Sequence, residues 1–99
     1  MTAILKKIAI GSDHRGVEFK SELINFLRDE GYEVLDCGAF NSDPVDYPVI
    51  ALSVAKHVAA GDCHRGIILD GAGIGSSIAA NKVTGVRAAL CNTEAAANN

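Results

Sequence analysis

Two short polar segments carry the residue types that a catalytic or anion-binding site needs. The first is Ser12-Asp13-His14-Arg15, and the second runs from the carboxylate Asp70 through Gly71, Ala72, Gly73, Gly75 and Ser76. Glycines let a ligand approach the backbone closely, and the N–H groups that open a helix can converge on an anion. The second segment therefore predicts Asp70 as a catalytic base and the amides of residues 71–75 as an oxyanion cradle. The alternative is a tight strand-to-helix turn whose glycines serve packing alone.

Asp13 and His14 follow an apolar run, Ile8-Ala-Ile10, and precede a helical pattern. In one interpretation both side chains contact a ligand. In the other, Asp13 is a helix N-cap and His14 is a solvated turn residue. Arg15 is equally consistent with a phosphate contact and with a surface position.

The periodicity of the chain predicts alternating strands and helices around these segments. Strands are expected at 7–11, 33–36, 65–70 and 86–90, and helices at 16–30, 48–60 and 75–82, with an N-cap at Asn92 or Thr93. The apolar stripe of the first helix is Phe19, Leu23, Phe26 and Leu27. That of the second is Ile50 or Ala51, Val54 or Ala55, and Val58, and glycines at 31 and 61 end the two helices.

This alternation predicts an α/β fold, a Rossmann-like three-layer αβα sandwich with a parallel sheet of about four strands. Ligands bind such sheets beyond the carboxyl ends of the strands. Both polar segments follow a predicted strand at that edge, so we expect them to lie side by side. Their convergence points to a site more strongly than either motif alone.

Length and composition narrow the functional classes. The 99 residues are expected to form one domain, residues 1–99, with an aliphatic core, since 48% of the chain is hydrophobic and only 5% aromatic. The net charge of −3, with no basic cluster larger than Lys6-Lys7, argues against a nucleic-acid partner. No apolar run approaches a membrane span and no signal-peptide pattern opens the chain, so a cytoplasmic protein is expected. Three cysteines without CxxC spacing predict neither a disulfide framework nor a zinc site.

Two nucleotide-binding motifs fit the glycine segment poorly. Gly71-x-Gly73-x-x-Ser76 approximates the dinucleotide fingerprint, but that motif belongs after a first strand and needs an acidic residue at the end of the second. A phosphate loop of the Walker type is excluded because no Gly-Lys-Ser/Thr sequence follows.

Taken together, the segments 8–16, Asp46-Tyr-Pro48, 66–83 and 85–91 resemble the ribose-5-phosphate isomerase B / galactose-6-phosphate isomerase family over nearly the whole chain. The resemblance is to the N-terminal two-thirds or so of a family member. It implies a Rossmann-like fold and a metal-free, cofactor-free aldose–ketose isomerisation of a phosphorylated sugar. It also implies a homodimer, or a higher homo-oligomer, whose active sites are shared between subunits.

The same resemblance assigns roles to individual residues. Asp13 would contact sugar hydroxyls or the ring oxygen, His14 would help to hold the phosphate, and the amides from Gly71 to Gly75 would stabilise an enediolate. Asp70 stands where many members carry a catalytic cysteine. The galactose-6-phosphate isomerase subunit type that lacks the thiol is similar to this chain in carrying an aspartate at this place. Ser76 stands near a position where some members use a glutamate base.

Three departures from the family pattern qualify that assignment. Asp70 replaces the cysteine, Ala72 replaces a frequent threonine, and the family's later segment, with a His-Asn-Asp motif and phosphate-binding arginines, is not in these 99 residues. We therefore expect little or no catalysis by the 99 residues alone. The rival hypothesis is a non-catalytic sugar-phosphate-binding or partner subunit, and the sequence leaves the identity of the sugar open.

Overall fold

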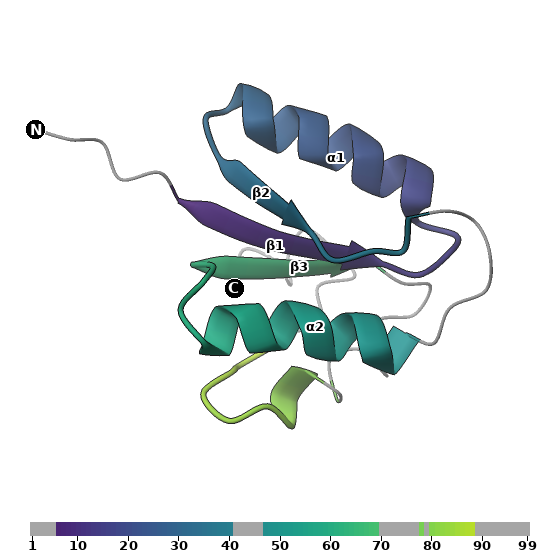
Figure 1. Cartoon of the computed structure of the whole chain (residues 1–99). Helices are drawn as coiled ribbons and strands as arrows, with labels where there is room; N and C mark the ends of the chain where they lie inside the picture. The colour runs from purple at the N-terminus through teal and green to yellow at the C-terminus, as the bar shows by residue number, and fades with distance from the viewer. Residues whose placement is uncertain (1–5, 41–46, 70–77, 79, 89–99) are drawn as a thin grey trace, which may run out of the picture.

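The fold is an alternation of three strands and two helices in a computed structural model, which describes residues 6–40, 47–69, 78 and 80–88. In chain order the elements are β1 (Lys7–Ser12), α1 (Val17–Asp29), β2 (Glu33–Asp36), α2 (Tyr47–Ala59) and β3 (Arg65–Leu69). All five lie where the periodicity of the sequence predicts them (Figure 1).

The strands form one parallel sheet with the order β2-β1-β3, so that β1 lies in the centre. Ile8 of β1 pairs with Val34 on one side and with Arg65 on the other. α1 contacts β1 and β2, whereas α2 contacts β1 and β3 from the opposite face (Figure 1). The predicted three-layer αβα arrangement is confirmed.

Glycines end both helices, as the sequence predicts. Gly31 has φ +95°, and its N–H donates to the carbonyl of Arg28 (3.0 Å) while the N–H of Tyr32 donates to that of Leu27 (3.0 Å). These two bonds form a Schellman motif, which satisfies the last carbonyls of α1 before β2 begins. Gly61, at φ +83°, follows the end of α2 in the same left-handed conformation.

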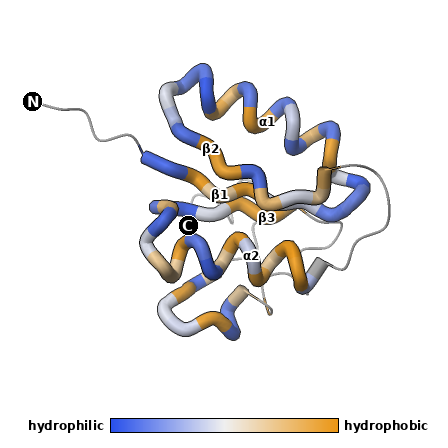
Figure 2. Tube along the Cα trace, viewed as in Figure 1, coloured by the Kyte–Doolittle hydropathy of each residue, from blue (hydrophilic) through white to orange (hydrophobic). Residues whose placement is uncertain are grey.

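The packing of α2 on the sheet depends on two strand glycines, Gly11 and Gly66. A Cβ built on Gly11 would lie 2.5 Å from Cγ2 of Ile50, and one on Gly66 would lie 2.6 Å from Cγ1 of Val54. Both distances are far below van der Waals contact, so the missing side chains are what lets the helix approach the strands. Figure 2 shows the result as hydrophobic segments of β1, β3 and α2 brought together. The predicted stripe of α2 is confirmed, with Ile50, Ala51, Val54 and Ala55 buried.

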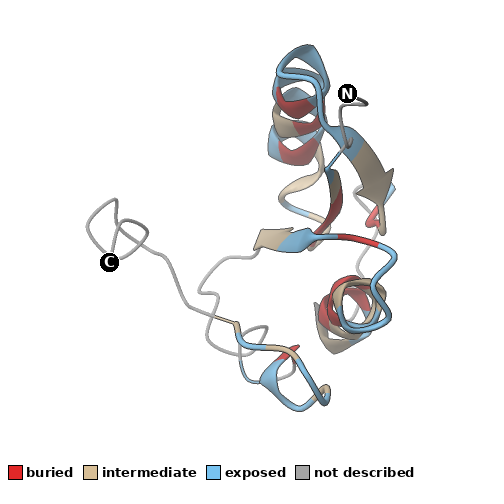
Figure 3. Ribbon diagram, turned by 90° about the vertical axis from the view of Figure 1, so that its left-hand side faces the viewer, coloured by how far each residue is buried: buried red, intermediate tan, exposed pale blue. Residues whose placement is uncertain are grey.

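The predicted stripe of α1 is wrong for two of its four residues. Phe19 and Phe26 are 61% and 58% exposed, and the helix instead turns Lys20, Ile24 and Leu27 toward the sheet. The cause is Lys20, which a hydropathy pattern assigns to solvent but which is buried here and paired with the half-buried Asp36. Figure 3 shows this buried side of α1 facing the sheet.

The predicted fourth strand is also wrong over the part that the structure describes. Residues 86–88 are not in a strand, and the sheet has three strands among the described residues rather than four. The reason is that the side chain of Asn81 hydrogen-bonds both backbone groups of Ala88. Its nitrogen donates to the carbonyl of Ala88 (3.0 Å), and its oxygen accepts the N–H of Ala88 (2.9 Å). Those peptide groups are therefore bonded to a side chain instead of a neighbouring strand.

Of the third predicted helix, residues 78, 80 and 81 are helical. Several other positions lie outside the described residues: 75–77 and 79 of that helix, 41–46 between β2 and α2, 89–90 of the predicted fourth strand, and the predicted N-cap at 92 or 93. Neither α1 nor α2 combines the length and apolarity that a bilayer-crossing helix requires, and the rest of the described chain offers no such helix.

Replacing Gly66 with alanine tests the close approach of α2. We expect the free energy of unfolding to fall by about 1–3 kcal/mol, because the added methyl overpacks against the stiff, buried side chain of Val54. Urea denaturation measures the loss, and a double-mutant cycle with Val54→Ala should show favourable coupling, since the smaller residue removes the clash. A Gly66→Ala chain within about 0.5 kcal/mol of the unsubstituted protein would contradict this packing.

Candidate functional site

The carboxyl ends of β1 and β3 are joined by a hydrogen bond at one edge of the sheet. Ser12, the last residue of β1, pairs with Leu69, the last of β3, and the N–H of Asp13 donates to the carbonyl of Leu69 (2.9 Å). The polar turn after β1 therefore starts beside the point where the chain leaves β3 for Asp70. The predicted convergence of the two segments requires β1 and β3 to be neighbours, and the sheet order β2-β1-β3 makes them neighbours.

Asp13 organises the turn between β1 and α1. Its Oδ1 accepts the N–H groups of Arg15 (3.0 Å) and Gly16 (2.9 Å), so the side chain closes the turn just before the helix. The alternative in which Asp13 is the helix N-cap is wrong, because the N-cap of α1 is Gly16 and no side chain caps it. Asp13 instead closes the turn that precedes the helix. Both bonds use the same oxygen, and no bond to Oδ2 is found within the described chain. The second oxygen is therefore able to accept a hydrogen bond from a ligand hydroxyl.

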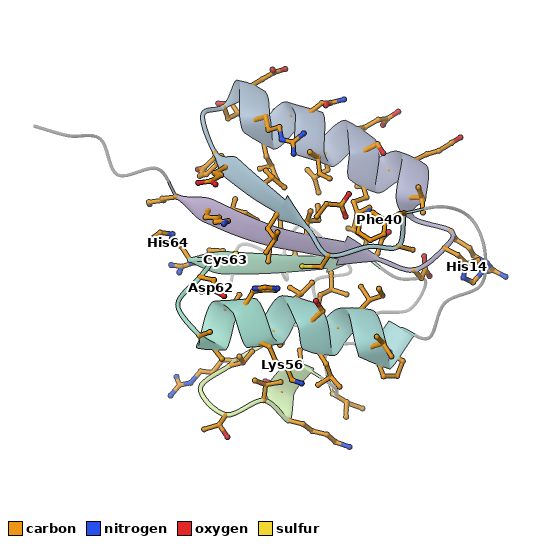
Figure 4. The ribbon with its side chains drawn as sticks, viewed as in Figure 1. His14, Phe40, Lys56, Asp62, Cys63 and His64 are labelled. Carbon is orange, nitrogen blue, oxygen red and sulfur yellow. The ribbon has the colours of Figure 1, made fainter. Side chains whose placement is uncertain are left out.

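Two polar atoms at this edge are buried without a partner among the described residues: Oγ of Ser12 and Nδ1 of His14. His14 follows Asp13 directly, and Figure 4 shows its side chain projecting from the carboxyl edge of the sheet. An unpaired imidazole nitrogen can donate to or accept from a ligand, according to its tautomer. Arg15 is exposed, which fits either of its two predicted roles.

The second predicted segment lies outside the described residues. This applies to the candidate base and to every candidate anion-binding residue after it: Asp70, Gly71, Ala72, Gly73, Gly75 and Ser76. Their roles stay predictions. The structure locates their starting point, the carbonyl of Leu69, through its bond to Asp13.

A third group at the same edge was missed by the sequence analysis. Lys20 of α1 reaches Asp36, the last residue of β2, with Nζ 2.5 Å from Oδ1, and is itself 1% exposed. One signal for it exists in the sequence: Lys20, Ile24 and Leu27 stand at helical spacing, so a lysine lies on the same stripe as two apolar residues.

His64, Cys63 and Asp62 lie at the opposite edge of the sheet (Figure 4). Nδ1 of His64 accepts the N–H of Lys7 (3.2 Å), and His57 pairs with Asp62 (3.2 Å). Cys63 is packed in the core beside Ala9 and Val54. No three His, Cys, Asp or Glu side chains gather into a candidate metal site in the described part of the chain.

Neither described cysteine has the electrostatic environment of a nucleophile. Burial raises the pKa of the Cys37 thiol, more than its hydrogen bond to Ser53 and the charge of Lys20 lower it. Burial likewise raises the pKa of Cys63. A reactive cysteine needs a lowered pKa, because the thiolate is the reacting species. Neither thiol is therefore suited to take a proton from a substrate near neutral pH.

Comparison with known proteins gives a consistent picture. A profile of the family described as Ribose/Galactose Isomerase matches residues 8–99. The Escherichia coli (strain K12) protein named ribose-5-phosphate isomerase B is 47% identical over 88 residues, which are 89% of this chain and 59% of that protein. A Listeria innocua protein named ribose-5-P isomerase B is 48% identical over 84% of this chain and 56% of its own length.

Solved structures agree with these sequence matches. Ribose-5-phosphate isomerase B of Clostridium thermocellum superposes with a TM-score of 0.88 at 52% identity, covering 92% of this chain and 62% of that one. The Mycoplasma genitalium enzyme, solved with bound ribulose-5-phosphate, has a TM-score of 0.88 at 37% identity over 96% of this chain and 64% of its own. The chain thus spans about three-fifths of the length of these relatives.

Alkylation kinetics test the raised thiol pKa values. In a Cys91→Ser background, we expect iodoacetamide to modify Cys37 and Cys63 more slowly at pH 8 than it modifies free cysteine, because less thiolate is present. Since the folded-state pKa values are raised, stability should also decline as the pH rises past the ordinary thiol range. Mass spectrometry of the alkylated protein measures the rates. A thiol that reacts faster than free cysteine at pH 7 would contradict the assignment.

Proposed function

The chain belongs to the family described as Ribose/Galactose Isomerase, and on that basis we propose that its site interconverts the aldose and ketose forms of a phosphorylated sugar. The substrate class is that of ribose 5-phosphate and ribulose 5-phosphate, the sugar phosphates in the names of its relatives. The observation that supports the proposal is the bond from Asp13 N–H to the carbonyl of Leu69, because it joins the start of the first predicted segment to the residue just before the second.

In the proposed reaction Asp70 moves a proton between C1 and C2 of the open-chain sugar, without a metal. The carboxylate removes the C2 proton of the aldose, an enediolate forms, and the same group returns the proton to C1, while the proton of the C2 hydroxyl moves to the C1 oxygen so that C2 becomes the carbonyl. A carboxylate can do this chemistry, since triosephosphate isomerase uses a glutamate as the base of the same kind of reaction. Its unperturbed pKa is roughly 4 to 5 units below that of a thiol, so Asp70 is a weaker base than the cysteine of many members.

The remaining candidate residues bind and orient the sugar. The amides from Gly71 to Gly75 stabilise the negative charge that develops on the enediolate oxygen, because fixed N–H donors need no reorganisation during the reaction. Oδ2 of Asp13 accepts a sugar hydroxyl or contacts the ring oxygen while Oδ1 stays bonded to the turn. His14, with Nδ1 unpaired among the described residues, helps to bind the phosphate.

The proposal also includes the assembly that the family resemblance implies: one isomerase-like domain over residues 1–99, a homodimer with shared sites, and a cytoplasmic location. The net charge of −3 argues against a nucleic-acid partner.

A second candidate function is favoured by one observation, the aspartate at position 70 in place of the family's cysteine. In that case the chain binds a sugar phosphate and another subunit supplies the base. The two functions differ in one measurable property, which is exchange of the C2 proton with solvent.

Replacing Asp70 with asparagine tests the catalytic role directly. Because the family's later segment is not in these 99 residues, exchange of the C2 proton of ribose 5-phosphate by the unsubstituted chain should be slow, and NMR in deuterated water detects it over a long incubation. Asp70→Asn should slow this exchange by about 10²–10⁴-fold, because the base is lost, and leave binding of the sugar largely intact. Asp62→Asn, the same change at the opposite edge, is the matched control and should retain full exchange.

Two results would decide against the catalytic proposal. Exchange that survives in Asp70→Asn removes Asp70 as the base. Binding of ribose 5-phosphate without any exchange by the unsubstituted chain favours the partner subunit instead.

A further inference from the structure

Lys20 is a charged side chain held in the interior of the protein. It is 1% exposed, its ammonium lies 2.5 Å from Oδ1 of Asp36 and 2.5 Å from the carbonyl oxygen of Ala39, and the ring of Phe40 lies 5.2 Å away. Burial of a charge is costly unless it is paired and hydrogen-bonded. Here a carboxylate, a carbonyl and an aromatic face surround the same ammonium, so its charge is compensated on several sides.

These contacts tie Lys20 to the segment that follows β2. The carboxylate of Asp36 also accepts the N–H of Gly38 at Oδ1 (2.9 Å), so one oxygen bridges the lysine and the start of the loop. The carbonyl of Ala39 is the lysine's second acceptor. One side chain from α1 therefore contacts this segment directly at Ala39 and, through Asp36, at Gly38.

The same segment is bonded to the tip of β1. The N–H of Ser12 donates to the carbonyl of Gly38 (2.7 Å), and the N–H of Ala39 donates to the carbonyl of Ser12 (2.9 Å). The next residue is Asp13, whose N–H reaches Leu69. A continuous path of hydrogen bonds thus runs from Lys20 through the loop and the β1 tip to the end of β3.

We propose that Lys20 is a positioning residue for the candidate site. Its ammonium, together with Asp36, fixes residues 38–40 against Ser12, and this sets the backbone on which Asp13 and His14 are presented to an anionic sugar. Lys20 does not itself contact the ligand, because it is buried and its ammonium is engaged by Asp36 and Ala39. The ligand named in this inference rests on the proposed function.

Stability alone does not explain an ion pair between a buried lysine and a half-buried aspartate at this place. Replacement of such a pair by apolar residues of similar size is often neutral or stabilising, whereas removal of one partner leaves the other uncompensated. The pair at Lys20 and Asp36 differs from an apolar pair in one respect, which is that it also bonds the backbone of Gly38 and Ala39. The pair therefore imposes on the loop a geometry that an apolar pair would not impose.

The first test measures affinity for ribose 5-phosphate by calorimetry. Lys20→Met should raise Kd by about tenfold or more, a loss of about 1.4 kcal/mol, because the loop and the β1 tip lose their anchor. Lys20→Arg should bind more tightly than Lys20→Met, since it keeps a donor for Asp36. The matched control is Ile24→Ala, a buried change one turn further along the same helix, which should leave Kd within about twofold at equal folded fraction.

A double variant separates positioning from stability. Lys20→Met combined with Asp36→Leu replaces the pair by apolar side chains, so it should recover stability relative to Lys20→Met alone. Its Kd should stay raised, because the bonds to Gly38 and Ala39 remain lost. Recovery of both stability and affinity in the double variant would overturn the proposal. This variant also serves where Lys20→Met alone does not fold.

Amide hydrogen exchange tests the inference without any ligand. Under conditions of equal global stability, the N–H groups of Ser12 and Ala39 should exchange faster in Lys20→Met than in Ile24→Ala. If the unsubstituted chain does not bind ribose 5-phosphate, the proposed function fails while this measurement still decides the positioning role. Equal exchange at both amides in the two variants would overturn it.

Discussion

The central place of β1 is the constraint on which the site depends. Because β2 and β3 pair with β1 from either side, the ends of all three strands come to one edge, where the backbone of Ser12 and Asp13 bonds to Gly38, Ala39 and Leu69. Asp13 and His14, the candidate site residues that follow β1, extend from this hydrogen-bonded backbone. The glycines at 11 and 66 are part of the same constraint, since they let α2 seat against β1 and β3.

Much of this fold could be predicted from the sequence because its signals are local. Glycines at 31 and 61 end the helices in left-handed conformations that other residues rarely adopt. The strands β1 and β3 each contain a short apolar run. The predicted bounds of β2, 33–36, match the structure. Helix ends and short strands of this kind can be recognised without knowing which residues lie across the sheet.

The errors share a different cause, which is a tertiary partner for a polar residue. Lys20 is buried because Asp36 and Ala39 lie opposite it, and this rotates α1 so that Phe19 and Phe26 are left exposed. Asn81 takes both backbone groups of Ala88, which the hydropathy pattern assigns to a strand. For the site, the residue types pointed to Asp13 and His14, but the sequence could not show that one oxygen of Asp13 is bonded to its own turn.

The most direct test of the proposed site is to locate the sugar phosphate on the folded chain. Backbone amide shifts, followed by two-dimensional NMR during titration with ribose 5-phosphate, report where the ligand binds. We predict that the largest shifts fall at Asp13–Gly16 and in the residues that follow Leu69, with little change at Asp62–His64. Shifts concentrated at the Asp62–His64 edge, with the turn after β1 unaffected, would contradict this placement of the site.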